Sequence, residues 1–449
     1  MDIGTLLPAW SALPFVGILL SIALCPLLAP RFWHHHFGKV SALWALVFAA
    51  PFVLRFGSAA LHELLHTAIV DYLPFLVLIG TLFMIGGGIH VAGAFRGTPA
   101  TNALLMVVGT LLASLVGTTG AAMVMIRPLL KANRHRHHRA HTVVFFIFLV
   151  ANIGGGLTPL GDPPLFLGFL HGVPFFWTLG LWKQVCFAGT VVLVVYVLHD
   201  LWYWRREPPH VRDGAPTPAE RVRVEGGVNL VLLAGVVAAV VGSGIWPGHE
   251  MAILGVSQQT GNLRRDAVLL ALLGASWLAT PKTVREANEF SFGPILEVAI
   301  LFAGIFVTII PAMAMLRVGE AGGMAFVVRA VREPAHFFWA SGILSSFLDN
   351  APTYLAFLST ALGRLFPGVA EHEAVSRVIR DHPAFLAAIS NGSVFMGANT
   401  YIGNAPNFMV KSIAEEAGVP MPSFFGYILG YSLPVLITLF LVMTWLFFR

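Results

Sequence analysis

The sequence has few charged residues and very little cysteine. Asp, Glu, Lys and Arg make up 11% of the 449 residues, whereas hydrophobic residues make up 57%. An ordinary soluble domain carries about 25% charged residues, so this chain cannot cover a water-exposed surface of normal size. The two cysteines, Cys25 and Cys186, lie within apolar runs, which argues against a disulfide framework or a zinc cluster. The composition therefore excludes a typical soluble enzyme and predicts a polytopic membrane protein.

A positively charged binding face is also lacking. The formal net charge is +5, but the basic residues occupy short loops between apolar runs, which is the pattern of membrane topology. We therefore expect no nucleic-acid partner. Residues Met1–Ala9 contain no Lys or Arg, so the positive region of a cleaved signal peptide is missing. The first apolar run is expected to remain as a helix.

Apolar runs of membrane-spanning length recur along the whole chain. Two of them, at about 101–130 and 336–363, are interrupted near the middle by small and polar residues. They predict re-entrant hairpins, because irregular backbone at membrane depth survives only inside protein or beside a polar cavity. The expected fold class is an all-α polytopic membrane protein of inverted repeats, with two re-entrant hairpins and two broken helices. The full crossings are expected at about 8–30, 39–56, 71–94, 142–180 (broken), 184–204, 228–246, 266–280, 294–316, 383–410 (broken) and 422–448.

A polar stretch divides the chain into two halves. Residues 205–226 combine Pro, Gly and mixed charge, which predicts a cytoplasmic loop between two repeats. We assign 1–37 to a first transmembrane helix, 38–204 to the first repeat and 227–449 to the second repeat. With the N-terminus outside, Lys and Arg favour the inner side in the first half, and this bias reverses in the second half. In this topology the first hairpin enters from the inside and the second from the outside.

Matching polar interruptions occur in the two halves. The hairpin runs contain Thr118-Thr119-Gly120 and Asp349-Asn350-Ala351-Pro352-Thr353. Each is followed by a broken span with the pattern Asn, then Thr-x-x-Gly-(Asp/Asn)-x-Pro, which begins at Asn152 in the first half and at Asn391 in the second. Paired interrupted helices in corresponding positions indicate a transporter binding site near the bilayer midplane.

The interruptions carry the chemistry that a small-cation site needs. Gly and Pro free backbone carbonyls and amides, while Thr, Asn and Asp side chains add hard oxygen ligands. The alternative is that Gly and Pro merely kink packed helices, but four breaks in two matching pairs favour a site. The candidate ion- or substrate-binding residues are Thr118, Thr119, Asn152, Thr158, Asp162, Asp349, Asn350, Thr353, Asn391, Asn399, Thr400 and Asn404.

Three strings of the sequence, SSFLDNAPTYL, GGLTPLGDPPLF and GANTYIGNAPNF, resemble the ion-transporter superfamily. They are most similar to its sodium/proton antiporter and citrate-transporter-like branches, and the resemblance covers about residues 38–448. It implies that the hairpin tips and the loops Gly156–Pro163 and Ala398–Ala405 hold the ion and substrate. It also implies a homodimer in which a transport part moves against a scaffold. The dicarboxylate branch carries Ser-Asn-Thr at its hairpin tips, whereas the tips of this chain carry Thr-Thr-Gly and Asp-Asn-Ala. This departure from the dicarboxylate branch puts a carboxylate substrate in doubt.

Three acids within the apolar runs are candidate proton carriers. Asp162 and Asp349 lie in helix breaks, whereas Glu297 lies near the start of a span, where an interfacial position is the alternative. An ionisable side chain within a span costs about 2.5–3.5 kcal/mol on insertion scales and is expected to be functional. Asp162 also suits a helix N-cap before Pro163. A carboxylate that binds either a proton or a sodium ion, but not both, supplies the competition that an antiporter needs.

The balance of charge around the breaks favours a cation. Arg127 is the one basic residue near a break, and we expect its side chain to reach the inner interface. The predicted function is therefore exchange of sodium or lithium for protons, with a sodium- or proton-coupled citrate or carboxylate transporter as the alternative. No cofactor is expected beyond the transported ions. The expected partners are the lipid bilayer and a small cation, and the expected location is the inner membrane, with several crossings.

One motif predicts a protein of a different class. His62-Glu63-Leu64-Leu65-His66 matches H-E-x-x-H, in which two histidines on one helix face hold zinc and the glutamate acts as a base. A catalytic zinc usually needs a third protein ligand, and no later motif clearly supplies one. The match also falls in an expected loop between two spans, so we do not expect an enzyme.

Overall fold

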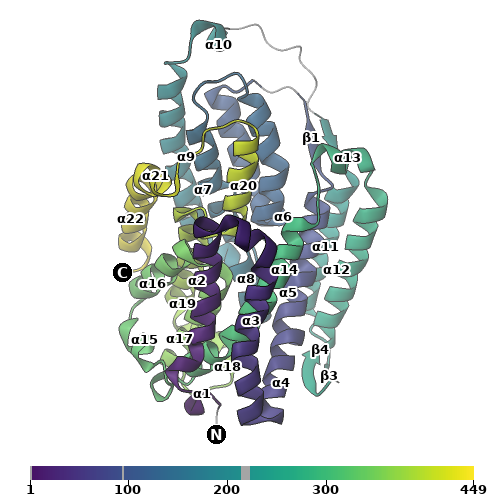
Figure 1. Ribbon diagram of the computed structural model, residues 1–449, viewed down its shortest axis with the longest axis vertical. Helices are drawn as coiled ribbons and strands as arrows, with labels where there is room; N and C mark the ends of the chain where they lie inside the picture. Colours follow the sequence, from purple (N-terminus) through teal and green to yellow (C-terminus); the bar gives the residue numbers. More distant parts are fainter. Residues whose placement is uncertain (1–2, 94–95, 214–222) are drawn as a thin grey trace.

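The computed structural model describes residues 3–93, 96–213 and 223–449. Long helices lie side by side along the longest axis of the molecule (Figure 1). Within these residues nine helical stretches are long and apolar enough to cross a membrane, and one of them is the interrupted stretch Pro99–Ala132. The prediction of an all-α polytopic membrane protein is confirmed.

Two expected crossings are not among these nine stretches. The crossing expected at 266–280 forms the end of α12 (Thr260–Ala279), whose first turns carry Arg264, Arg265 and Asp266. The crossing expected at 383–410 is interrupted between α19 and α20. Both are helical, but charge shortens the apolar part of the first and a break divides the second.

The elements of the first half are almost all helical, and η marks short 3-10 or π turns. They are α1 (Ile3–Leu6), η1 (Ala9–Ala12), α2 (Leu13–Leu28), α3 (Pro30–Phe56), α4 (Ser58–His66), η2 (Thr67–Tyr72), α5 (Leu73–Gly86), β1 (His90–Ala92), α6 (Pro99–Ala132), α7 (Ala140–Leu149), η3 (Ile153–Leu157), α8 (Pro163–Leu170), η4 (Phe175–Leu181), α9 (Trp182–Trp204) and α10 (Pro209–Asp213). The short helix η3 separates α7 from α8, so the first broken span has the expected form.

The second half has the same character. Its elements are β2 (Arg223–Glu225), α11 (Val228–Ile245), β3 (Glu250–Ile253), β4 (Val256–Gln259), α12 (Thr260–Ala279), α13 (Lys282–Ala287), α14 (Gly293–Arg317), η5 (Gly319–Ala321), α15 (Ala325–Ala330), α16 (Pro334–Phe347), α17 (Asn350–Leu365), α18 (Glu371–Asp381), α19 (Pro383–Met396), η6 (Gly397–Asn399), α20 (Ala405–Glu416), α21 (Phe424–Tyr427), η7 (Ile428–Ile437) and α22 (Thr438–Phe447). Here η6 separates α19 from α20, which repeats the break of the first half.

Two small antiparallel strand pairs close the ends of the helices. β1 pairs with β2 in the register His90↔Glu225 to Ala92↔Arg223, and β3 pairs with β4 from Glu250↔Gln259 to Ile253↔Val256. The first pair lies at the upper end in Figure 1 and the second at the lower end. The expected loop at 205–226 contains α10 and β2, and its residues 214–222 lie outside the described part of the chain.

Both interrupted stretches form helical hairpins. The arms of α6 turn at Gly117 (φ 80°, ψ 154°), and the backbone N–H of Gly97 donates to the carbonyl of Ala132, which brings the two ends of the hairpin together (2.9 Å). The second hairpin consists of α16 and α17, joined at Leu348 and Asp349. α6 lies in the upper half of the molecule and α16 and α17 lie in the lower half (Figure 1). The hairpins therefore enter from opposite ends.

The helices pack in two groups, and part of the seam between them is dry and apolar. We call α2–α5, α11, α12 and α14 the α14 group, and α6–α9 and α16–α22 the hairpin group. α14 packs along α17 and α5 packs along α6. Where α8, α14 and α17 meet, the space is too small for a water molecule. It is lined by Leu167, Phe302, Ile305, Phe306, Ile309, Pro352 and Leu355.

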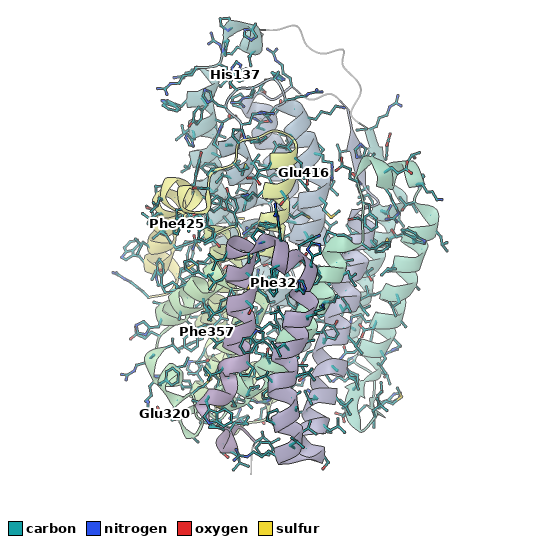
Figure 2. All side chains as sticks on the ribbon, in the orientation of Figure 1. Phe32, His137, Glu320, Phe357, Glu416 and Phe425 are labelled. Atoms are coloured by element: carbon teal, nitrogen blue, oxygen red, sulfur yellow. The ribbon has the colours of Figure 1, made fainter. Side chains whose placement is uncertain are left out.

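A buried ion network fixes the upper end of the hairpin group. Arg136 donates to both oxygens of Asp200 (2.5 and 3.1 Å), and the Nε2 atom of His141 lies 2.8 Å from Asp200. Glu207 accepts the backbone N–H of His137, which Figure 2 shows at this end of the molecule. The side chains of Arg136 and Asp200 are fully buried. Removing one partner of a buried ion pair is costly, so this network ties α9, which carries Asp200, to the loop after α6, which carries Arg136.

The turn at Gly117 gives the first prediction. Its backbone conformation is one that glycine alone adopts readily, and a Cβ atom there would lie 3.3 Å from the carbonyl oxygen of Leu160. We expect Gly117→Ala to lower the stability by about 1–3 kcal/mol. Thermal unfolding of the purified protein in detergent measures this change.

The matched control is Gly180→Ala, because a Cβ atom at Gly180 would meet no atom within 4 Å. The control should unfold at the wild-type temperature. Equal unfolding temperatures for Gly117→Ala and the wild type would show that the tip does not depend on this glycine.

Candidate ion-binding site

Asp162 is a buried acid at the break between η3 and α8. It follows Gly161 at the N-cap position of α8, with extended backbone (φ −147°, ψ 143°) and Pro163 as the next residue. Its side chain makes no capping hydrogen bond, although the sequence suggested that role. The residue is only 1% exposed. The carboxylate is therefore directed to partners other than its own helix.

Those partners come from both hairpin tips and from the other broken span. Thr118 donates its hydroxyl to Oδ1 of Asp162 (2.8 Å), and Asn350 donates its amide to Oδ2 (2.5 Å). Asn404 also donates to Oδ1, at 3.3 Å. One carboxylate thus joins the two repeats at the points where their helices are interrupted, and each of these three donors is neutral.

The backbone at each tip sets the position of its donor. The N–H of Thr118 donates to the carbonyl of Gly161 (2.8 Å), which fixes the first tip against the broken loop. At the second tip Asp349 caps α17 by accepting the N–H of Ala351 (3.1 Å). Asn350 follows directly and is fully buried, whereas Asp349 is half-buried. Because Asn350 directly follows Asp349 and donates to Asp162, the second tip places the two acids near each other.

The two repeats use the same bonds to hold tip and loop together. Thr158 donates to the carbonyl of Ser114, and Thr400 donates to the carbonyl of Ser346. The hydroxyl of each serine in turn donates to a carbonyl in its own broken span, at Gly154 and at Met396. The matching contacts bear out the pairing of interruptions that the sequence pattern indicated. The same comparison places Asp162 and Asn404 at equivalent positions of the two repeats. The first repeat therefore carries an acid where the second carries an amide.

A cluster of asparagines locks the two broken loops to each other. Asn152 donates to the Oδ1 atom of Asn407 (2.7 Å), and Asn404 donates to the carbonyl of Ala151 (3.0 Å). Asn407 donates to the carbonyls of Gly397 and Thr400, both at 2.9 Å. Because Asn404 also reaches Asp162, the cluster fixes the loop geometry around the carboxylate.

Other candidate residues in the described part of the chain hydrogen-bond to groups other than Asp162. Thr353 donates to the carbonyl of Asp349 (3.0 Å), and Asn399 donates to the hydroxyl of Ser346 (2.9 Å). Asn391 donates to the carbonyl of Ala387 within α19 (2.9 Å). Thr119 is half-buried beside Thr118 at the first tip.

Glu297 lies apart from the hairpins. It belongs to the first turns of α14, in the α14 group, where it lies near Trp33 and His34. Glu297 therefore belongs to a different helix group from Asp162 and Asp349.

The H-E-x-x-H motif lies on a helix, so its assignment to a loop between spans was wrong. His62 and His66 belong to α4, which continues through η2 into α5, and their ring centroids are 6.5 Å apart. Among the described residues, no group of three or more His, Cys, Asp or Glu side chains is placed to hold a metal ion.

Three residues that organise the site were not selected from the sequence. They are Ser114, Ser346 and Asn407, which bond the tips and loops as described. The two serines precede Thr118 and Asn350 by the same number of residues, and this equal spacing was a signal that aligning the tips would have revealed. Asn407 has no counterpart in the shared pattern, so only the fold identifies its role.

The fold and the central cluster define a class of protein. Hairpins that enter from opposite ends and meet paired broken helices at one buried cluster are the arrangement of a secondary transporter. The chain matches the family described as "Putative citrate transport" over residues 4–448, and it belongs to that family. It is also similar to uncharacterized transporters of Mycobacterium bovis and Mycobacterium tuberculosis. Each is 24% identical over 384 residues, which cover 79% of this chain and 81% of that protein. The protein is a multi-pass membrane transporter.

The asparagine cluster gives the second prediction. Asn407→Ala leaves the carbonyls of Gly397 and Thr400 without their present donor and Asn152 without its acceptor. Because buried polar groups without partners are costly, stability should fall by at least about 2 kcal/mol. Thermal unfolding in detergent tests the change.

Asn391→Ala is the matched control, since Asn391 is equally buried but the structure shows it making one local bond to Ala387. We expect the control to lose clearly less stability. A larger loss in the control than in Asn407→Ala would contradict the locking role of Asn407.

Proposed function

We propose that this transporter exchanges sodium, or lithium, for protons across the membrane. The observation that carries the proposal is the environment of Asp162, which is buried and accepts hydrogen bonds from Thr118, Asn350 and Asn404. These donors stabilise a carboxylate but do not neutralise it. A buried carboxylate without a basic partner gains from binding a proton or a metal cation.

The surrounding oxygen atoms suit a small hard cation. The amide nitrogen of Asn350 donates to Asp162, and its amide oxygen is buried without a hydrogen-bond partner among the described residues. Amide and carboxylate oxygens are the ligand type that hard cations take. A sodium ion beside Asp162 would be attracted by the carboxylate and by the amide dipole of Asn350, whereas a proton would occupy the carboxylate itself.

The family description favours citrate as the second candidate substrate. A multiply charged anion is best bound by positive groups, and the donors to Asp162 are neutral. Arg127, the basic residue near the first tip, pairs instead with Glu289 on the surface (2.7 Å). Repulsion by Asp162 and the absence of a nearby basic partner in the described structure support the cation over citrate.

Alternating access requires one group of helices to move against the other. The seam of Leu167, Phe306 and Pro352 is dry and apolar, so sliding there breaks no hydrogen bond. Hairpins that enter from opposite ends let each tip close the site from its own side. We propose that the hairpin group carries the ion across while the α14 group stays in place. We further propose that the protein works as a homodimer in an inner membrane.

The acids give the third prediction. We expect Asp162→Asn and Asp349→Asn to abolish sodium-driven pH change in proteoliposomes, because an amide cannot exchange a proton for sodium. Glu297→Gln should keep exchange near the wild-type rate, since Glu297 lies on α14 away from the tips. The measurement is the quenching of a pH-sensitive dye inside the vesicles after addition of sodium.

Wild-type exchange in Asp162→Asn would contradict the assignment of the acid. Labelled citrate is offered to the same vesicles. Citrate uptake that depends on sodium or protons, together with no sodium-driven pH change in the wild type, would favour the carboxylate transporter.

A further inference from the structure

A chain of four charged side chains includes Glu371, the first residue of α18, a helix that lies in the lower part of Figure 1. The central residue of these four, His171, lies 3.4 Å from Asp71 through Nε2 and contacts Glu371 through Nδ1. The second oxygen of Glu371 lies 2.6 Å from Arg317. When His171 is protonated, the four charges alternate in sign.

The chain crosses the seam between the two helix groups twice. Asp71 belongs to η2 and Arg317 ends α14, so both belong to the α14 group or its direct continuation. His171 directly follows α8, and Glu371 begins α18, both in the hairpin group. The contacts Asp71–His171 and Glu371–Arg317 therefore join the parts that the proposed transport motion would separate.

Burial makes the Asp71–His171 contact stronger than a surface ion pair, whereas the Glu371–Arg317 contact is partly open to water. The side chains of Asp71 and His171 are each 9% exposed, that of Glu371 is 26% exposed and that of Arg317 is 39% exposed. Surface pairs contribute little because water screens them, whereas breaking a buried pair leaves a charge without its partner. The rest of the seam near α8 is apolar, so this chain is the polar connection that resists separation there.

We propose that the contacts Asp71–His171 and Glu371–Arg317 form a proton-sensitive latch that holds the hairpin group in the position seen here. The inference rests on the proposed alternating access, but not on which substrate is carried. Opening of the latch would free the hairpin group to move toward the opposite position. The proton that controls it is bound by His171 and is separate from the proton at Asp162.

The groups that face His171 determine the direction of the pH effect. Burial lowers the pKa of His171, but Glu371 and Asp71 outweigh burial and raise this pKa to about 9, against a smaller opposing effect of Arg317. Burial raises the pKa of Glu371, but His171 and Arg317 bring it to about 2.

Further charges lie around this chain. Glu63 and His66 on α4 act on Asp71, and His372 on α18 lies beside Gly172. The latched position raises the pKa of His171 above its ordinary value. The stabilisation by protonated His171 is therefore fully present below about pH 6.5. It is lost as the pH rises through about 9, where His171 gives up its proton.

A distance measurement between the two groups tests the latch, and it is the fourth prediction. Spin labels are placed at two exposed positions, Met251 on β3 and Ser376 on α18, after Cys25 and Cys186 have been replaced by serine. Double electron–electron resonance in nanodiscs should give mainly one distance at pH 6. At pH 10 the ratio of molecules that show a second distance to molecules that show the first should rise about fivefold or more.

Variants of the latch residues distinguish the effect of charge from the effect of side-chain shape. His171→Gln and Asp71→Asn should show the second distance already at pH 6. His171→Lys keeps the positive charge and should retain the first distance at pH 6 and through about pH 9. The control His372→Gln should behave as the wild type, because His372 is exposed and lies outside the chain.

Unchanged distances in both His171→Gln and Asp71→Asn would overturn the latch, as would a wild-type distribution that does not change with pH. The readout needs no sodium and no citrate. A latch that responds as expected in a protein that exchanges no sodium for protons would therefore reject the proposed substrate and leave the latch standing.

Discussion

The arrangement depends on one buried negative charge that has neutral hydrogen-bond donors. Asp162 is removed from water, and its oxygens accept bonds from Thr118, Asn350 and Asn404. A charge in this setting is costly unless a cation or a proton joins it. Each donor stands where a helix is interrupted, so the breaks in the chain and the carboxylate form one unit. Without the breaks, backbone and side chains could not converge on one point.

The inverted repeat explains how such a point arises midway between the ends of the molecule. The two hairpins enter from opposite ends (Figure 1), and matched bonds from Thr158 and Thr400 fix each tip to its broken loop. The repeats differ where chemistry is needed, because Asp162 in one faces Asn404 of the other. The frame formed by the two hairpins and the two broken loops is thus symmetric, but its ion-site residues are not. In the proposed mechanism the apolar seam beside α14 allows this frame to move, and the proposed latch of charged side chains controls when it moves.

Local patterns predicted much of this, and tertiary packing decided the rest. Apolar runs indicated the helices, and glycine, proline and polar residues marked the tips that carry Thr118 and Asn350. The asparagine lock was not predictable, because Asn407 meets Asn152 only after the two broken spans pack together. The ion chain of Asp71, His171 and Glu371 was missed for the same reason. Charge at the start of α12 shortened a crossing that hydrophobicity alone had suggested.

The central claim is that sodium and a proton compete for Asp162, and proton release on sodium binding tests it most directly. Purified protein in weakly buffered detergent solution is mixed with sodium chloride, with choline chloride as the salt control, and the pH is followed. The account predicts acidification by sodium in the wild type and none in Asp162→Asn. Sodium binding without proton release, or equal release from the Asp162→Asn protein, would contradict it.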